Sequence, residues 1–174
     1  ELAHRAITEL VRGEAIVVSA VQGTAAGIGF PIAACADILL AADTAKFSLA
    51  YTKVGLSPDG GGSLLVHSLG LHRVLRLALL GDLLSVAEAQ AAGLVSKVVP
   101  ASELNDAVNE VVTQLAAGPR TALASTKLLI RHAAEANLET AMRREAQSIS
   151  ALAASDDGKE GIAAFLDKRS AQFS

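Results

Sequence analysis

The sequence predicts an α/β fold in which strands alternate with helices and a helical region completes the chain. Two apolar runs, residues 15–21 and 38–42, have the length of buried strands, and a helical segment at about 29–36 lies between them. Beyond residue 63 the apolar residues recur mostly at helical spacing. The order strand, helix, strand indicates a β-α-β unit.

The other elements of the first part follow from local patterns. The chain opens at Glu1, without Met, in a helix whose apolar residues share one face, so we expect further sequence upstream. An extended piece at 46–49 leads to a loop at 54–62 that is rich in Gly, and helices are expected at 64–69 and 73–80. Ser85 and Glu88 form a capping box that opens a short helix, and a last strand at 94–99 ends at Pro100.

The second part is predicted to be helical. An amphipathic helix at 104–115 is closed by Gly118 and Pro119, and further helices are expected at about 121–133, 138–154 and 159–170. We therefore divide the chain into an α/β core at 1–118 and a helical region at 119–174, which we expect to serve oligomerisation and pocket closure.

Composition excludes several function classes. The 174 residues are 51% apolar and 19% charged, with a net charge of -3 and only 3% aromatic residues, which speaks against nucleic acid or an anionic membrane as a partner. No apolar stretch reaches bilayer length and no signal peptide is recognisable, so a cytoplasmic protein is expected. Cys35 is expected to be a small buried residue, and the four His show no metal-ligand spacing.

The stretch GTAAGIGFP at 23–31 allows three interpretations. It resembles the glycine turn of NAD(P)-dependent short-chain dehydrogenases, with Asp43 as the ribose-binding acid, but the Tyr-x-x-x-Lys pair of those enzymes is absent around Tyr51. The glycines could equally serve only a tight turn in a scaffold protein. In the third interpretation, backbone N–H groups at the start of the helix stabilise an oxyanion.

A family resemblance decides between these interpretations. The stretch SAVQGTAAGIGFPIAACADILLAADTAKFSLAYTKVGLSPDGGGS resembles the central motifs of the crotonase superfamily, the enoyl-CoA hydratases and isomerases. LLGDLLSVAEAQAAGLVSKVV and EGIAAFLDKRS resemble two later motifs of the same family. The resemblance covers nearly the whole chain and is nearest to the phenylacetate-pathway isomerases. It implies a crotonase-like ββα spiral core, with its N-terminal portion absent here, followed by a helical C-terminal region.

The resemblance also implies a substrate and an oxyanion site. Members of the family bind acyl-CoA and hold the thioester carbonyl between two backbone N–H groups, of which one falls on Ile28. The second donor comes from an N-terminal loop that this sequence does not contain, so an inactive acyl-CoA-binding fragment is an open alternative. The substrate-binding positions implied by the motifs are Gly27, Gly29, Pro31, Tyr51 and Pro58. No metal or redox cofactor is implied, only coenzyme A as part of the substrate.

The same resemblance assigns the chemistry to Asp59. The two Glu of the hydratases fall on Pro31 and Tyr51, which cannot accept a proton as a carboxylate does. Isomerases of the family carry an acid at the position of Asp59, so we expect it to shuttle a proton, and we expect its pKa to be raised in an apolar acyl pocket. Its alternatives are an N-cap, a nucleophile as in aryl-CoA dehalogenases, and a hydratase mechanism with another carboxylate.

The C-terminal motif implies a contact with CoA. In the family, a Phe and a Lys corresponding to Phe165 and Lys168 approach the CoA adenine and phosphates, often across a subunit interface. The alternative is an amphipathic helix with Phe165 in the core and Lys168 in water. The family assembles as trimers or pairs of trimers, and the apolar helical residues at 64–80 and 138–154 favour a homotrimer or hexamer here.

Overall fold

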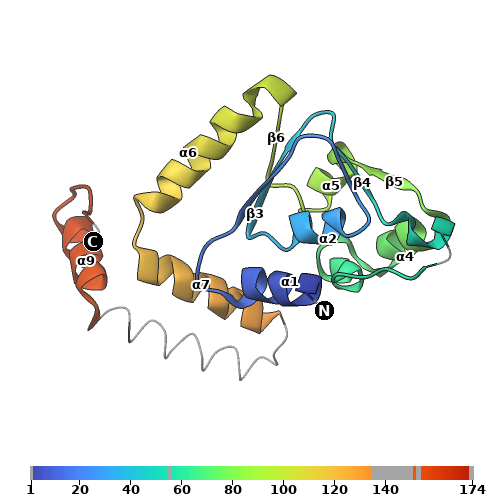
Figure 1. Cartoon of the computed structure of the whole chain (residues 1–174). Coiled ribbons are helices and arrows are strands. Elements are labelled where there is room, and N and C mark those ends of the chain that lie inside the picture. Colours follow the sequence, from blue (N-terminus) through green and yellow to red (C-terminus); the bar gives the residue numbers. More distant parts are fainter. Residues whose placement is uncertain (1, 55, 135–150, 152–153, 173–174) are drawn as a thin grey trace. The chain divides into compact units, whose positions relative to one another are not determined.

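The computed structural model describes residues 2–54, 56–134, 151 and 154–172 (Figure 1). The chain forms two compact units. The first unit comprises Glu1–Gly13 and Val17–Val111, and the second comprises Glu14–Ile16 and Val112–Ser174. The boundary falls inside the long helix α6 (Leu104–Ala116). Each unit is described by itself below.

The first unit holds all the described strands. Its elements are α1 (Leu2–Arg12), β1 (Val18–Val21), β2 (Thr24–Ala26), α2 (Gly29–Ala34), β3 (Ile38–Ala42), β4 (Lys46–Ser48), β5 (Leu83–Ser85) and β6 (Lys97–Val99). Two short 3-10 helices, η1 (Ala50–Val54) and η2 (Gly62–Leu65), precede α3 (Val66–Leu69), α4 (Leu71–Leu80) and α5 (Val86–Ala91). A third 3-10 helix, η3 (Ala101–Glu103), leads into α6 (Leu104–Ala116).

The strands form two small sheets. In the first, β3 lies between β1 and β6 and all three run parallel, with Ser19 opposite Leu39 and Ala41 opposite Val98. In the second, β4 lies between β2, which is parallel to it, and β5, which is antiparallel. The predicted α/β class and the β-α-β unit formed by β1, α2 and β3 are confirmed.

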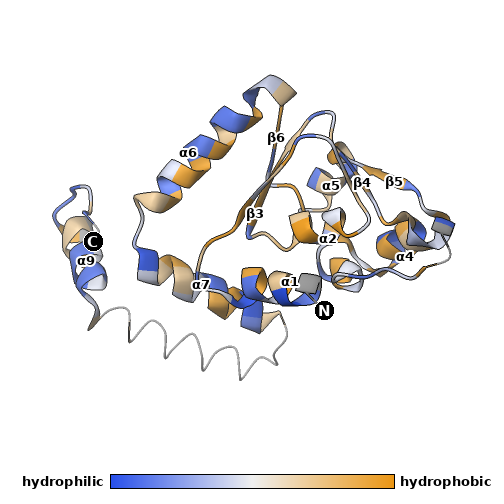
Figure 2. Ribbon diagram, in the orientation of Figure 1, coloured by the Kyte–Doolittle hydropathy of each residue, from blue (hydrophilic) through white to orange (hydrophobic). Residues whose placement is uncertain are grey.

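Strand β3 is buried on both faces, as expected for the central strand of a parallel sheet. Its side chains alternate between two apolar clusters, with Leu39 and Ala41 in the larger and Leu40 and Ala42 in the smaller. The smaller cluster is completed from α6, whose apolar and polar residues alternate at helical spacing (Figure 2). The larger contains Phe30 and Phe47, whose rings are tilted by 40° to each other with centroids 5.0 Å apart.

Several predicted elements are shorter in the structure or were missed. The run at 15–21 forms a strand only from Val18, because Ala15 belongs to the second unit and its carbonyl accepts a hydrogen bond from Lys127 Nζ at 2.7 Å. The run at 94–99 forms a strand only from Lys97, because the N–H groups of Leu94 and Val95 both donate to the Ala89 carbonyl. Strands β2 and β5 were not predicted, since three residues are too short to show a periodic pattern.

Local signals placed other elements correctly. The capping box is present, because the Glu88 N–H donates to Ser85 Oγ and the Ser85 N–H donates to the Glu88 carboxylate. Cys35 is buried, with its thiol donating to the Ile32 carbonyl at 3.0 Å.

The described residues include no helix with the length and hydropathy of a membrane span.

The second unit contains the later helices. Helix α7 (Arg120–Ala133) and helix α9 (Asp156–Leu166) confirm two of the predicted C-terminal helices, with slightly shifted ends. Lys127 is buried in α7 and donates to the Ala15 carbonyl of the same unit. The predicted helix at 138–154 lies almost entirely outside the described residues.

Candidate active site

The glycine stretch is not one turn but two turns around a strand. Gly23 leaves β1, residues 24–26 form β2 against β4, and Gly27 then turns the chain into α2. Gly27 has φ of +54°, a conformation that residues with a Cβ rarely adopt, and its N–H donates to the Ser48 carbonyl at 3.1 Å. A dinucleotide loop runs directly from strand to helix, so the intervening strand argues against that interpretation.

Ile28 follows this turn with one free backbone donor. It has right-handed helical angles, and its N–H forms no hydrogen bond to any residue that the structure describes. Its side chain is 36% exposed. The predicted oxyanion donor is therefore free to bind an acceptor.

The turn that carries Asp59 packs directly on Ile28. Gly60 has φ of +59°, and a Cβ placed on it would lie 2.6 Å from Ile28 Cγ1 and 3.6 Å from Ile7 Cδ1 on α1. Only a glycine allows this approach. Residues 32 positions apart in the sequence, Ile28 and Gly60, thus pack the turn that follows Asp59 against the side chain of Ile28.

Tyr51 lies next to the turn at Gly27. Its hydroxyl is 3.9 Å from the position of a Cβ on Gly27, is buried, and has no hydrogen-bond partner among the described residues. Burial raises the pKa of the Tyr51 phenol, and the charge of Asp59 adds to the rise, while the nearby Asp59 backbone opposes it. An unpaired buried hydroxyl is costly unless a ligand or a water satisfies it.

The expectation that the pKa of Asp59 is raised was wrong. The Asp59 side chain is 63% exposed, and its pKa is lowered, first by the hydrogen bond from the Gly60 N–H and then by His4. His4 Nε2 lies 2.6 Å from Asp59 Oδ1. The sequence pattern suggested an apolar pocket and gave no sign of His4, which is 55 residues away and in no motif with Asp59. Two hydrogen bonds to an exposed carboxylate favour its charged form.

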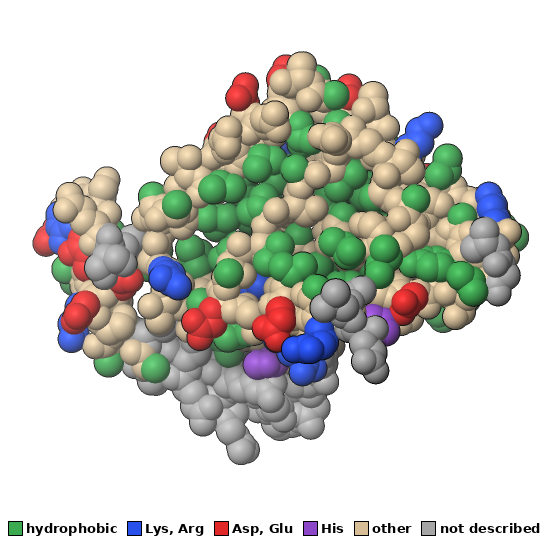
Figure 3. Space-filling view, in the orientation of Figure 1, with side chains coloured by type: hydrophobic (Ala, Val, Ile, Leu, Met, Phe, Trp, Pro, Cys, Tyr) green, Lys and Arg blue, Asp and Glu red, His purple; other side chains and the backbone are tan. Residues whose placement is uncertain are grey.

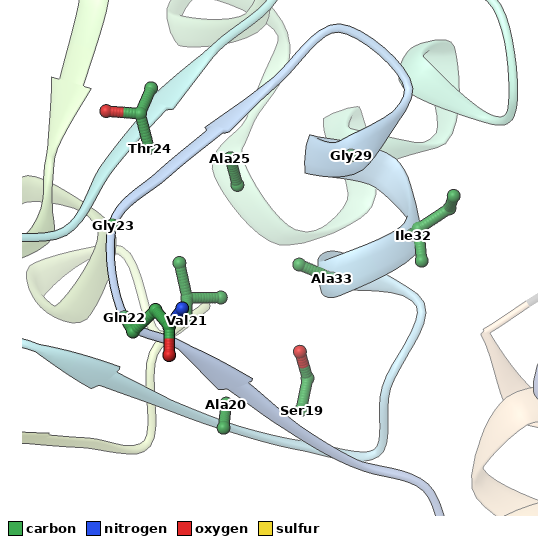
Figure 4. A pocket seen from close by; sticks show the side chains of 10 residues that line it. All are labelled: Ser19, Ala20, Val21, Gln22, Gly23, Thr24, Ala25, Gly29, Ile32 and Ala33. Carbon is green, nitrogen blue, oxygen red and sulfur yellow. The ribbon is translucent and has the colours of Figure 1, made fainter.

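The other predicted substrate residues are distributed around this centre. Pro58 contacts the same turn, with its Cβ 3.0 Å from the position of a Cβ on Gly62. Pro31 is buried in α2. Gly29 lines a cavity of about 400 Å³ between β1, β2 and α2, toward which Ala33 points (Figure 4). Ser19, Gln22 and Thr24 also line this cavity; they lie within the central motif stretch, but the sequence analysis gave them no role of their own.

Phe165 and Lys168 belong to the second unit and are not placed relative to Ile28 or Asp59. Phe165 lies in α9, and its side chain is outside the described part of the structure. Lys168 is exposed just beyond α9 and is the only described non-glycine residue with positive φ, at 54°. Beside it, Arg169 donates to both oxygens of Glu160 at 2.6 and 2.8 Å, and this pairing lowers the pKa of Glu160 to about 2.

The residues described in the structure include no group of three His, Cys, Asp or Glu side chains that could bind a metal ion. What the site offers is an unpaired backbone donor, a nearby ionised carboxylate with an imidazole partner, and a buried phenol. Chemically, this combination can stabilise a developing oxyanion and move a proton.

Comparison with known proteins gives consistent similarities. Residues 3–174 match the family model of enoyl-CoA hydratase/isomerase. The chain is 40% identical over 158 residues to a 1,2-epoxyphenylacetyl-CoA isomerase of Escherichia coli, covering 90% of this chain and 60% of that protein. It is 32% identical over 174 residues to a trans-2-decenoyl-[acyl-carrier-protein] isomerase of Streptococcus mutans, covering 99% of this chain and 66% of that protein.

A solved structure agrees with these relatives. The crystal structure of an enoyl-CoA hydratase from Polaromonas superposes with a TM-score of 0.95 at 37% identity, covering 99% of this chain and 67% of the other. This chain therefore has the fold of these proteins over nearly all of its own length. It spans about 60% of the length of the first E. coli relative.

Proposed function

Because the chain belongs to the enoyl-CoA hydratase/isomerase family of the crotonase superfamily, we propose that it binds an acyl-CoA thioester and acts as an enoyl-CoA isomerase. The reaction is the shift of a double bond from the β,γ to the α,β position. Coenzyme A takes part as a portion of the substrate, and the chemistry below needs no further cofactor.

Ile28 holds the thioester oxygen in this proposal. Its N–H is free of partners within the described residues and follows the Gly27 turn. Removal of a proton from the α-carbon moves charge onto the thioester oxygen, and one backbone donor to such an oxygen contributes about 3 kcal/mol of transition-state stabilisation. The family uses a second donor from a loop outside this chain, so the proposal concerns the complete enzyme.

Asp59 moves the proton. The ionised carboxylate takes a proton from the α-carbon, the electron pair of that C–H bond forms a dienolate, and the same carboxyl returns a proton to the γ-carbon. Its lowered pKa keeps Asp59 in the charged form that can accept this proton at neutral pH. The single observation that carries the proposal is the contact of Gly60 with the Ile28 side chain, which packs the turn after the proposed base against the residue that carries the proposed oxyanion donor.

Isomerisation is favoured over hydration by the residues at two positions. Where hydratases of the family carry Glu, this chain has Pro31, buried in α2, and Tyr51, whose hydroxyl is buried. Neither can activate water as a carboxylate does. The relatives described above include isomerases and a hydratase, so the choice rests on the residues at these two positions.

Asp59→Asn tests the assignment of the base. The amide keeps the size and much of the hydrogen bonding of the side chain but cannot accept the proton, so isomerisation of a 3-enoyl-CoA should fall by about 100-fold or more. Binding of the acyl-CoA should persist, and the free energy of unfolding should change by less than about 1 kcal/mol. Steady-state rates, calorimetry with acetoacetyl-CoA and thermal melts measure these three quantities.

Other outcomes would point to the alternatives. Fast hydration of crotonyl-CoA by the wild type and by Asp59→Asn alike would assign the chemistry to a different carboxylate. Binding of acetoacetyl-CoA without any turnover would indicate an acyl-CoA-binding fragment. Accumulation of a covalent acyl or aryl adduct on Asp59 would indicate nucleophilic catalysis.

We also propose a homotrimer or a pair of trimers as the working assembly, as in the family. Helix α4 carries a stripe of exposed leucines at helical spacing, Leu71, Leu75 and Leu79, which a monomer would leave in water. Hydrophobic side chains are also widely exposed on the face of the protein that Figure 3 shows. In such an assembly Phe165 and Lys168 are candidates for contacts with CoA. Cytoplasmic location stays a prediction from the sequence.

A further inference from the structure

The outer edges of the two sheets are open. Strand β1 pairs only with β3, and strand β2 pairs only with β4, so both are edge strands in the part of the chain that the structure describes. An edge strand presents a row of backbone N–H and C=O groups that lack partners, and such a row is a template for pairing with another strand. The mechanism proposed above gives neither edge a role.

The recorded hydrogen bonds fix which residues of β1 face outward. Backbone groups of successive residues in a strand point to alternate sides. The Val17 carbonyl accepts the Ile38 N–H at 3.2 Å, so every second residue from Val17 onward faces β3. Val18 and Ala20 therefore point their N–H and C=O groups away from the sheet, and Ala20 is exposed.

The edge of β2 is open in the same way. The Gly23 carbonyl accepts the Lys46 N–H at 3.2 Å, so Gly23 and Ala25 face β4. Thr24 and Ala26 then point their backbone groups outward, and both residues are exposed. Two successive strands of the chain thus offer backbone donors and acceptors to an outside partner.

No sequence feature protects these edges from pairing. Proteins usually guard an open edge with charged side chains, proline or a β-bulge. Residues 15–30 contain neither a charged residue nor proline, and the ladders of β1 and β2 run in register without a bulge. The composition of both strands therefore favours pairing with a further strand.

The space beside the edges fits an extended segment. The cavity of about 400 Å³ shown in Figure 4 borders the consecutive residues 19–25 and is also lined by Gly29, Ile32 and Ala33 of α2. Ile32 is apolar but 43% exposed. A neighbouring strand lies about 4.8 Å from an edge and pairs its own C=O and N–H groups with it at regular spacing, which a compact small molecule cannot do.

The solved relatives contain polypeptide that this chain lacks. The chain covers 67% of the superposed hydratase, so about a third of that protein has no counterpart here. We propose that an extended, uncharged segment of the complete enzyme, outside these 174 residues, adds strands to the open edges of β1 and β2. Main-chain hydrogen bonds supply the affinity, and the apolar residues of α2 select apolar side chains on one face of the segment. Strand addition does not depend on which reaction Asp59 performs.

Hydrogen exchange of backbone amides, measured by NMR, tests this pairing. The probe is the portion of the E. coli 1,2-epoxyphenylacetyl-CoA isomerase that has no counterpart in this chain, co-expressed with the 174-residue protein. Exchange at Val18, Ala20, Thr24 and Ala26 should become slower by about tenfold or more, because pairing removes these N–H groups from water. Exchange at Ser19, whose N–H already faces β3, should change little.

Proline at an outward position separates pairing from folding. Ala20→Pro removes an N–H that takes no part in the ladder with β3, so the protein should stay folded while the amount of co-purified probe falls by about tenfold. Ala20→Val keeps this N–H in a residue that favours strands and should bind the probe as the wild type does. Thr24→Pro makes the same change on β2 and replaces Ala20→Pro if that variant does not fold. Circular dichroism melts measure folding.

Three results would overturn the proposal. The first is a probe that does not co-purify, or that binds without slowing exchange at the outward amides. The second is protection of these amides in the chain alone that disappears on dilution, which would mean that the edges pair between copies. The third is protection by acetoacetyl-CoA alone, which would assign the edges to the substrate site. None of these measurements needs turnover, so they decide strand addition separately from the role of Asp59.

Discussion

Gly60 is the residue that joins the two halves of the candidate site. It combines φ of +59° with a contact to Ile28 that leaves no room for a Cβ. The resemblance identified Ile28 and Asp59, but nothing in the sequence indicated that the glycine between Asp59 and η2 would touch Ile28. Such a contact depends on the path of the chain between residues 28 and 60, which local patterns do not determine.

Gly60→Ala should therefore damage both the fold and the site. The left-handed backbone and the overlap with Ile28 should lower the free energy of unfolding by about 2 kcal/mol. The isomerisation rate of the folded variant should also fall, because the Ile28 side chain must shift to make room for the new Cβ. Gly23→Ala is the control, since a Cβ there meets nothing within 4 Å, and its unfolding free energy should change by less than about 1 kcal/mol. Equal effects of the two substitutions would show that the Gly60 contact is unimportant.

The pKa of Asp59 should respond to its imidazole partner. His4→Ala removes one of the two hydrogen bonds that lower this pKa, so the pKa should rise, while the Gly60 N–H keeps it from rising further. A carboxyl with a lowered folded-state pKa stabilises the fold above its unfolded pKa, and this contribution disappears as the pH falls through the folded pKa. Carboxyl-carbon NMR titration measures the shift; an unchanged pKa would mean that His4 does not bond Asp59 in solution.

At the scale of elements, strong periodic or capping signals were sufficient for prediction. The helix of the capping box, α6 and α7 were all predicted from the sequence, because several residues contribute to each signal. Strands β2 and β5 were missed, because three residues pair only when β4 is already placed between them. The pairing of these strands depends on the tertiary structure. Because β2 was missed, Gly27 was interpreted as part of a strand-to-helix turn, whereas it follows the end of β2.

The end of α9 carries a residue in an unfavourable conformation. Arg169 donates its N–H to the Ala164 carbonyl at 3.1 Å, which is the bond pattern of a helix end with a left-handed residue at Lys168. Lys168→Gly should raise the free energy of unfolding by about 0.5–1 kcal/mol, because glycine adopts this conformation without the Cβ penalty. Thermal and denaturant unfolding of the two proteins measure the difference.

The same variant tests the predicted contact with CoA. If Lys168 binds the CoA phosphates, Lys168→Gly should bind acetoacetyl-CoA more weakly although the protein is more stable. Lys159→Gln removes an exposed charge within α9 and should leave the affinity unchanged. Unchanged affinity for both variants in calorimetry would favour the alternative in which Lys168 only faces water.

At the scale of the molecule, the exposed leucines of α4 need a partner surface. Leu71, Leu75 and Leu79 are 57%, 42% and 65% exposed, while Val74 and Leu77 of the same helix are buried in the core. The helix is thus apolar on two faces, and only one of them is covered within the first unit. The sequence predicted apolar surface here, but which leucines remain outside the core depends on how α4 packs, which the periodic pattern alone cannot decide.

Leu75→Glu should therefore break the assembly without unfolding the chain. A charge at the centre of an apolar contact between copies loses its hydration without gaining a partner, whereas at an exposed position of a monomer it is tolerated. Light scattering at micromolar concentration should give a multiple of the 17.7 kDa chain mass for the wild type and the single-chain mass for the variant. Ala87→Glu adds the same charge to an exposed position in the first turn of α5, where an acidic side chain is favourable, and should leave the assembly intact. A monomeric wild type, or a Leu75→Glu variant with undiminished mass, would contradict the proposed role of this leucine stripe, and a monomer that still isomerises enoyl-CoA would show that the active site is complete within one chain.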